Sequence, residues 1–239
     1  PCTTFSIAGK REEDWGKKRS FSEGASTQSL DDLFFRFIEV ADKIRPRAVI
    51  AENVPGLLIG AAKGYVKKII RDFAKIGYST QIVDANAANY GVAQSRRRIF
   101  FIARRNDLKL SAFKLPATKP PLVVKEVCAG VKQTRDRPIT PVERAHWLAV
   151  RPGDSFKKDH GRMGSYRLNG AGVAPTLTAE AHFFHWSEPK EISQEAYMRI
   201  QSFPDDYDLC SKKAQYVCGM SVPPRMMEAI ANQAMQQWF

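Results

Sequence analysis

One cysteine stands where ordinary packing does not explain it. Cys2 follows Pro1 in the opening "PCTTFS" and precedes a polar, basic run that contains Lys10 and Arg11. A cysteine in a loop beside cationic groups ionises more readily than one in apolar packing, and the thiolate is the reactive form. Free cysteine is more often a small buried hydrophobe. We therefore predict either a reactive thiol at Cys2 or a packing residue that another part of the chain covers.

The other cysteines and the paired histidines do not form a metal pattern. Cys128, Cys210 and Cys218 are irregularly spaced, with no CxxC pair and no histidine at ligand intervals. Neither a zinc site nor a disulfide framework is indicated, so we expect reduced thiols that serve in packing. His182 and His185 in "AHFFHW" favour aromatic packing or DNA contact over metal binding.

Three short motifs follow one another along the chain: "PCTTFS" (1–6), "AENVPGLL" (51–58) and "QSRRR" (94–98). In this order they resemble the cytosine-5 DNA methyltransferase family, whose patterns are PCxxFS, ENV and QxRxR. Two further matches are "RIQSFPDDY" (199–207) and "GMSVPP" (219–224), and "APTLTA" resembles the threonine-leucine element of the family's target recognition domain. The resemblance covers nearly all of the chain except most of 106–188.

The resemblance implies roles for four residues in catalysis. Carbon 5 of cytosine is too weak a nucleophile to accept a methyl group until a covalent bond at carbon 6 makes the ring an enamine. Cys2 would be the nucleophile, and Glu52 would hold or supply the proton at ring nitrogen 3. Arg96 and Arg98 would donate to the base oxygen, to phosphate or to Glu52. The resemblance places Arg98 in the pocket, while Arg96 fits either there or as a brace for the loop or backbone.

The methyl donor implied by the family is S-adenosylmethionine. The family's glycine-rich motif for this cofactor is not present in the chain, and the "GAG" at 170–172 reads as a turn. Met220 replaces the asparagine that is usual in the last motif, which weakens or reroutes polar contacts there. The residues that would contact the cofactor fit a turn, core or helix-start position equally well: Pro1, Leu33, Ser221 and Val222.

Double-stranded DNA is the expected partner. The net charge of +12 favours a polyanion, although a lysine-rich surface explains it equally well. A base inside a duplex must be flipped out before a thiolate can reach it, and the polar segment 6–21 would close over it. The residues predicted to contact DNA are Ser6, Gly9, Lys10, Gln94, Thr176 and Leu177.

Hydrophobic periodicity predicts an α/β fold, a partial Rossmann-like methyltransferase sheet joined to a small loop-rich domain. A helix is expected over 29–44, capped by Ser29 and with Phe37 on its apolar face, and another over 64–77 with Ile70 inward. Short apolar runs at 48–54, 79–85 and 98–105 predict strands. A short helix before Pro204 and a terminal helix begun by Pro223 and Pro224 complete the elements.

Composition divides the chain into three predicted segments. Residues 1–105 would be the catalytic domain, 106–188 a proline-rich and glycine-rich target recognition domain, and 189–239 a segment that returns to the catalytic domain. We expect a missing N-terminal segment or subunit to complete the sheet and the cofactor site. Because no run approaches the roughly 20 apolar residues of a membrane helix, we expect a cytoplasmic, nucleoid-associated protein of bacterial or phage restriction and modification.

Three functions remain open from the sequence. The first is a sequence-specific DNA cytosine-5 methyltransferase. The second is a DNA-binding accessory or split subunit that is inactive without the missing part. The third is a related enzyme that acts on transfer RNA, which shares the fold and the nucleophile.

Overall fold

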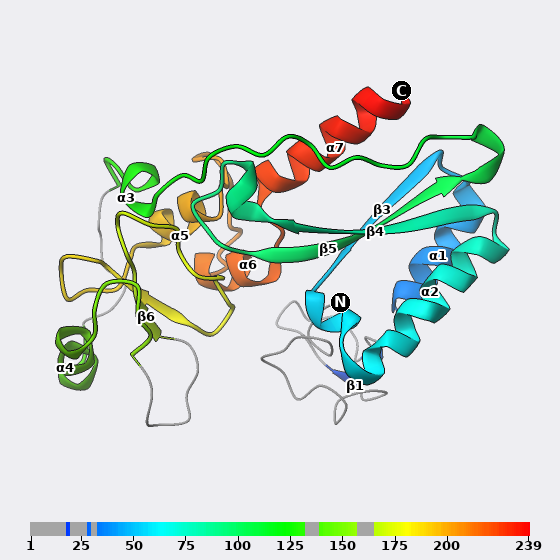
Figure 1. Ribbon diagram of the computed structural model, residues 1–239. Helices are drawn as coiled ribbons and strands as arrows, with labels where there is room; N and C mark the ends of the chain where they lie inside the picture. The colour runs from blue at the N-terminus through cyan, green and yellow to red at the C-terminus, as the bar shows by residue number, and fades with distance from the viewer. Residues whose placement is uncertain (1–17, 20–27, 30–32, 132–138, 157–164) are drawn as a thin grey trace. The chain divides into compact units, whose positions relative to one another are not determined.

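The computed structural model describes residues 18–19, 28–29, 33–131, 139–156 and 165–239 (Figure 1). The strands are β1 (Lys18–Arg19), β2 (Gln28–Ser29), β3 (Ala48–Asn53), β4 (Tyr78–Asn86), β5 (Arg97–Arg105), β6 (Ser165–Arg167) and β7 (His182–Phe184). The α-helices are α1 (Leu33–Ile44), α2 (Lys63–Lys75), α3 (Val124–Val127), α4 (Pro141–Ala149), α5 (Gln194–Ile200), α6 (Ala214–Met220) and α7 (Pro224–Trp238). Single 3₁₀ turns are η2 (Pro55–Leu58), η3 (Gly60–Ala62), η4 (Ala87–Tyr90) and η5 (Asn106–Leu108).

The described residues form two compact units. The first contains the described residues up to Ala85, together with Arg97–Leu115 and Ala234–Phe239. The second contains Asn86–Arg96 and the described residues of Pro116–Gln233. The chain therefore leaves the first unit after β4, makes a loop in the second, and returns as β5.

The first unit is built on a sheet in which β5 lies between β3 and β4. The pairing of β3 with β5 is antiparallel, with Ala48 opposite Arg104 and Asn53 opposite Ile99. Ile99 to Ala103 of β5 are fully buried, which explains why this strand reads as a continuous apolar run rather than an alternating one. The predicted α/β class is confirmed, and the three strands expected from the sequence all form.

Helices α1 and α2 lie along one face of this sheet (Figure 1). Ile38 and Ala41 of α1 share a core with Val66, Ile69 and Phe73 of α2, and with alternate residues of β5. Successive strand residues point to opposite faces, so Ile99, Phe101 and Ala103 face these helices while Phe100 and Ile102 face the other side.

Two details of the predicted helices are wrong. The helix predicted over 29–44 forms as α1 over Leu33–Ile44, and the cap predicted at Ser29 stays a prediction, because it depends on residues 30–32, which lie outside the described residues. The side chains of Phe37 and Ile70, predicted to point inward, are 40% and 38% exposed. The buried face of each helix is narrower than the apolar face that the sequence pattern predicts, and each of these side chains lies at its edge.

The second unit has one core that joins its loops to its helices. Leu168, Leu177 and Phe183 from the loop-rich region pack in the same cluster as Ile200 of α5 and Cys218 of α6. The cluster also holds the single turn of α3. Residues on both sides of position 188 therefore share a hydrophobic core, and the chain crosses between the units at 85–86, 96–97, 115–116 and 233–234. The functional assignment of the three predicted segments stays a prediction.

Three short helices of the second unit, α3, α4 and α6, were not expected from the sequence. α4 begins with a capping box in which Thr140 accepts from the Glu143 N–H and Glu143 accepts from the Thr140 N–H, with Pro141 as its first residue. α6 begins at Ala214, whose N–H donates to the Gln194 side chain. α4 carried a recognisable sequence signal, and α6 depends on a tertiary contact.

Gly219 fixes how closely α6 approaches the segment before β7. A Cβ at this position would lie 2.1 Å from the backbone nitrogen of Ala179 and 2.6 Å from the carbonyl carbon of Thr178. No real Cβ tolerates such contacts with backbone atoms, so only glycine permits this packing. The glycine of the "GMSVPP" motif therefore serves contact with the "TLTA" segment.

Gly219→Ala is expected to lower the free energy of unfolding by about 3 kcal/mol or more, because the backbone on both sides must move apart. Gly64→Ala is the matched control, since it is also a helical glycine and its Cβ would meet nothing within 4 Å. The control is expected to raise the free energy of unfolding by about 0.5 kcal/mol. Urea unfolding of both variants measures the difference, and equal stabilities would contradict the packing described.

Candidate active site

Glu52 and Arg98 lie on the same face of the first unit's sheet. Glu52 of β3 is opposite Phe100 of β5, and Arg98 is two residues from Phe100 along the same strand. Paired residues of an antiparallel ladder, and residues two apart in a strand, point to one face. Glu52 and Arg98 are thus diagonal neighbours on the face opposite α1 and α2.

These two side chains form an ion pair. Arg98 Nε lies 2.7 Å from Glu52 Oε1, and the side chains are 10% and 25% exposed. A second nitrogen of the Arg98 guanidinium donates to the carbonyl of Arg97 at 2.8 Å. A charge-assisted contact of this length in a half-buried place fixes the carboxylate while one side of it stays open to solvent.

Gln94 connects three segments of the second unit. Its side chain is fully buried. Its Oε1 accepts from the Leu177 N–H at 3.0 Å, and its Nε2 donates to Gln201 Oε1. Gln201 in turn donates to the carbonyls of Cys218 and Ser221 at 3.0 and 3.1 Å. Gln94 and Leu177 were predicted to contact DNA, but both side chains are buried and contact protein in this structure.

Arg96 extends this buried network. Its side chain is 2% exposed, and its guanidinium donates to the carbonyls of Leu177 and Gly219, both at 2.8 Å. Backbone hydrogen bonds between 93–95 and Ala174, together with the Thr176 hydroxyl on the Ser95 carbonyl, hold the same segments side by side. Of the two roles predicted for Arg96, this geometry supports the brace.

The loop that carries Gln94 and Arg96 is closed at its root by Asn86. The Asn86 carboxamide accepts from the N–H groups of Arg96 and Ala88, and the Ala87 N–H donates to the Arg96 carbonyl. Asn86 and Gln201 were not among the predicted site residues. Both lie inside stretches that carry the family resemblance, so the sequence did mark their positions.

The remaining predicted residues are divided among different places. Leu33 is the first residue of α1 and is half-buried. Ser221 and Val222 connect α6 to α7 and are half-buried, and Met220 is 41% exposed. The others lie outside the described residues: Pro1, Cys2, Ser6, Gly9 and Lys10.

Two of the three described cysteines are unsuited to nucleophilic chemistry. Burial raises the pKa of the Cys128 thiol to about 11 and that of Cys218 to about 12. Cys210 is exposed, contrary to the packing role predicted, and its backbone N–H donates to Asp208 Oδ1 at 2.8 Å. Among the cysteines of the chain, Cys2 stays the predicted nucleophile.

His185 packs as predicted, with its ring stacked on Trp186 at 3.8 Å between centroids. Burial and the charge of Lys190 lower its pKa. Within the described ranges, no three His, Cys, Asp or Glu side chains converge as they would around a metal ion. In the same ranges, no helix is both long enough and apolar enough to cross a membrane.

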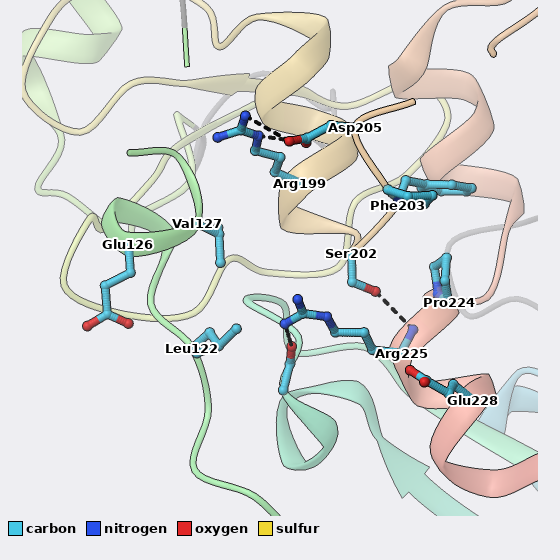
Figure 2. Close-up of a pocket in the computed structure, with 12 residues that line it drawn as sticks. Leu122, Glu126, Val127, Arg199, Ser202, Phe203, Asp205, Pro224, Arg225 and Glu228 are labelled. Carbon is cyan, nitrogen blue, oxygen red and sulfur yellow. Dashed lines mark hydrogen bonds and ion pairs between the residues drawn. The ribbon is translucent and has the colours of Figure 1, made fainter. Parts of the chain in front are cut away.

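A cavity of about 720 Å³ lies in the second unit (Figure 2). Its wall includes Phe203 and the ion pair between Arg199 and Asp205, with Nε to Oδ1 at 2.9 Å. Figure 2 also shows the Arg225 N–H directed at the Ser202 hydroxyl, 3.2 Å away. Among the described residues predicted for catalysis, cofactor or DNA, none lines this cavity.

Comparison with known families decides what these motifs represent. The model of the C-5 cytosine-specific DNA methylase family matches residues 1–134 and 120–236. The chain belongs to this family. The match spans both units and every motif quoted above, so the Glu52–Arg98 pair and the Gln94–Arg96 network are parts of a methylase sequence.

Individual relatives agree with this membership. The chain is 30% identical to the Type II methyltransferase M.Sau96I of Staphylococcus aureus over 97% of its own length, and it spans 58% of that relative. It is 32% identical to M.NgoPII of Neisseria gonorrhoeae, covering 89% of this chain and 73% of the other. M.FnuDI of Fusobacterium nucleatum is 39% identical over 41% of this chain and 30% of that relative.

Solved structures share the fold at low sequence identity. A protein of an E. coli prophage, described as a DNA modification methyltransferase, matches with a TM-score of 0.75 at 21% identity, over 89% of this chain and 75% of that one. A DNMT2 variant from Spodoptera frugiperda matches with a TM-score of 0.65 at 15% identity, over 98% and 77%. These matches confirm a methyltransferase fold.

The residues predicted to contact the cofactor are described in part. The hydroxyl and the carbonyl of Ser221 both accept from Gln201 Nε2 at 3.1 Å. Leu33 begins α1 and Val222 lies between α6 and α7, and Pro1 lies outside the described residues. The methyl donor of the family is S-adenosylmethionine.

Arg96→Met is expected to lower the free energy of unfolding by about 3 kcal/mol or more. It leaves two buried carbonyls without their charged donor, and such losses are among the larger ones in proteins. Arg97→Met is the control, because Arg97 is the next arginine along the chain, is 67% exposed and pairs with Asp84 at the surface. It should cost less than about 1 kcal/mol. If urea unfolding gave the two variants the same stability, Arg96 would not be a brace.

Native labelling with iodoacetamide at pH 8 is expected to modify Cys210 and to spare Cys128 and Cys218. The two buried thiols have pKa values raised to about 11 and about 12, so almost no thiolate is present and solvent does not reach them. Peptide mass mapping measures the three sites, and labelling in 8 M urea is the control in which all three should react. Rapid native labelling of Cys218 would contradict the described core.

Proposed function

We propose that this protein methylates carbon 5 of a flipped cytosine in double-stranded DNA. The observation that carries the proposal is the Glu52–Arg98 ion pair, which forms on one sheet face from two motifs that are 46 positions apart in a family sequence. A carboxylate fixed by a guanidinium, with one side open, is the arrangement that a reaction at a pyrimidine ring nitrogen requires.

The proposed chemistry begins with the Cys2 thiolate. Its sulfur bonds to carbon 6, the electrons of the 5,6 double bond move toward carbon 4 and ring nitrogen 3, and nitrogen 3 gains or shares a proton held by Glu52. Carbon 5 is then part of an enamine and becomes nucleophilic. After carbon 5 is methylated, a base removes its proton and the carbon–sulfur bond breaks, which restores the aromatic ring and the thiolate.

Arg98 acts in this scheme through two contacts. It holds Glu52 at 2.7 Å, and its remaining N–H groups can donate to an oxygen of the base or of phosphate. The positive charge of the guanidinium stabilises the negative charge that develops on the ring. We assign Arg98 to the pocket and Arg96 to the support of the second unit.

The second unit would present residues to the DNA. Thr176 lies in the segment that Arg96 and Gln94 hold in place, and we infer that this segment approaches the target base pair. Residues 106–188 would read the sequence from the major groove, where each good base contact contributes roughly 1–3 kcal/mol of discrimination. Gln94 and Leu177 would support this surface from beneath, because their own side chains are buried.

The relatives favour DNA over transfer RNA. Those compared above carry the name Type II methyltransferase, and we infer a role in bacterial restriction and modification, with the reaction in the cytoplasm where the chromosome lies. The methyl donor would be S-adenosylmethionine. The chain spans 58% of M.Sau96I, and we propose that a further segment or subunit completes the cofactor site.

Covalent trapping tests the proposal. A pool of random duplexes made with 5-fluorocytosine, incubated with the chain, S-adenosylmethionine and the N-terminal half of a relative, should yield a protein–DNA adduct, because fluorine at carbon 5 cannot leave as a proton. Cys2→Ser should abolish the adduct, and Cys210→Ser should leave it unchanged. Glu52→Gln should slow its formation about 100-fold or more, since the proton at nitrogen 3 is lost. Glu39→Gln, an exposed glutamate of α1, is the matched control.

Three outcomes would count against the proposal. An adduct with Cys2→Ser would remove the nucleophile. The chain could also bind duplex DNA in a salt-sensitive way and form no adduct, even after the N-terminal half of a relative is added. That outcome would support the accessory-subunit function instead. Methyl incorporation into transfer RNA but not into duplex DNA would support the RNA-modifying function instead.

A further inference from the structure

A second cavity of about 290 Å³ lies in the second unit. It is lined by β7, by α5 and the residues that precede it, and by the start of α6, and neither Glu52 nor Arg98 contributes to it. Pockets for drug-sized ligands are usually 300–1,000 Å³. The volume therefore suits a small group such as a phosphate better than a nucleobase or a cofactor.

His182 is oriented toward this cavity by a fixed carboxylate. Its Nδ1 lies 2.8 Å from Glu191 Oε1, and the hydroxyl of Tyr197 donates to the same oxygen at 3.3 Å. Tyr197 is held in turn, because it is 3% exposed and its hydroxyl oxygen accepts from the Phe183 N–H at 3.0 Å. With Nδ1 engaged and the side chain 40% exposed, Nε2 is the nitrogen left for a ligand.

The rest of the wall supplies donors and a cation. The carbonyl oxygen of the Gln194 side chain accepts from the Ala214 N–H at 2.9 Å, which leaves its NH₂ group to donate elsewhere. Gln215 uses one N–H on the Ala181 carbonyl at 2.6 Å and retains the second. The ammonium of Lys213 has no carboxylate partner among the residues that the structure describes.

The charged side chains that line this cavity favour an anion with a single negative charge. Glu191 is engaged by His182 and by the Tyr197 hydroxyl, and Lys213 contributes a positive charge. A phosphodiester carries one negative charge, whereas free phosphate at neutral pH carries up to two. Backbone phosphates also receive half to two-thirds of all hydrogen bonds in protein–DNA complexes.

We propose that this cavity binds a phosphodiester group of the nucleic-acid backbone. Lys213 neutralises the charge, the amide groups of Gln194 and Gln215 donate to its oxygens, and the His182 ring, which Tyr197 positions through Glu191, borders the bound group. The inference rests on the proposed function in one respect, namely that a nucleic acid is the substrate. It adds a contact that positions the duplex on the second unit and reads no sequence.

Salt-dependent binding of a fluorescent duplex to the full chain tests the site. Lys213→Ala should weaken binding about 10-fold at low salt and reduce the slope of log Kd against log salt by about one, as the loss of one neutralised phosphate requires. His182→Gln should weaken binding by a smaller factor. Lys212→Ala, an exposed neighbouring lysine, is the matched control and should stay within twofold of the wild type. Equal effects of Lys213→Ala and Lys212→Ala would overturn the proposal.

Nuclear magnetic resonance of the His182 ring separates the possible phosphate sources. The ring signal, identified by its loss in His182→Gln, should shift and saturate with dimethyl phosphate and with the duplex, and Tyr197→Phe should weaken the shift by disturbing Glu191. A shift with inorganic phosphate that neither the duplex nor dimethyl phosphate reproduces would overturn the assignment to the backbone.

The two proposals fail separately. If trapping through Cys2 never occurs but Lys213→Ala still lowers the salt slope, the phosphate site stands without the methylation. If trapping occurs and the slope is unchanged in Lys213→Ala, the phosphate site fails alone. Urea unfolding of each variant checks that a loss of binding does not reflect a loss of structure.

Discussion

The second unit depends on the buried guanidinium of Arg96. Removing a guanidinium from water is costly unless its N–H groups find acceptors, and here the acceptors are the carbonyls of Leu177 and Gly219. These partners are 81 and 123 positions away in the sequence, so one side chain holds together segments that no local rule connects. Gln94 and Gln201 add a second buried polar chain beside it, and the absence of a Cβ at Gly219 lets the backbones approach.

In the first unit, the register of two strands positions Glu52 and Arg98. A strand buried on both faces, β5, lies between two others and carries Arg98 near its beginning, diagonal to Glu52 of β3. The ladder sets the spacing of the two side chains, and the apolar residues around them limit the access of water. The pair is therefore a consequence of register, because a slip of one residue in β5 would turn Arg98 toward α1 and α2.

Much of the fold could be predicted, and the errors have physical causes. The strands around Val49, Val83 and Phe101 and the helix around Ile69 follow from apolar runs and periodicity. Phe37 and Ile70 misled because an apolar side chain beside a core stripe looks the same in sequence as one inside it. Loops and helices on both sides of position 188 share one core, which the composition of each segment does not reveal. Gln94 and Leu177 lie in motifs that resemble those of the family, but a motif in the sequence does not show whether a side chain is buried.

The sequence by itself determined the family and the identity of the reactive groups, because thiol, carboxyl and guanidinium chemistry belongs to residue types in a fixed order. Only the tertiary structure decided which arginine meets Glu52 and which one braces backbone, since Arg96 and Arg98 are two positions apart and chemically identical. The same holds for His182, whose partner Glu191 and neighbour Lys213 come from separate segments. Contacts between distant segments depend on how the chain packs, and packing is a property of the whole core rather than of any single stretch.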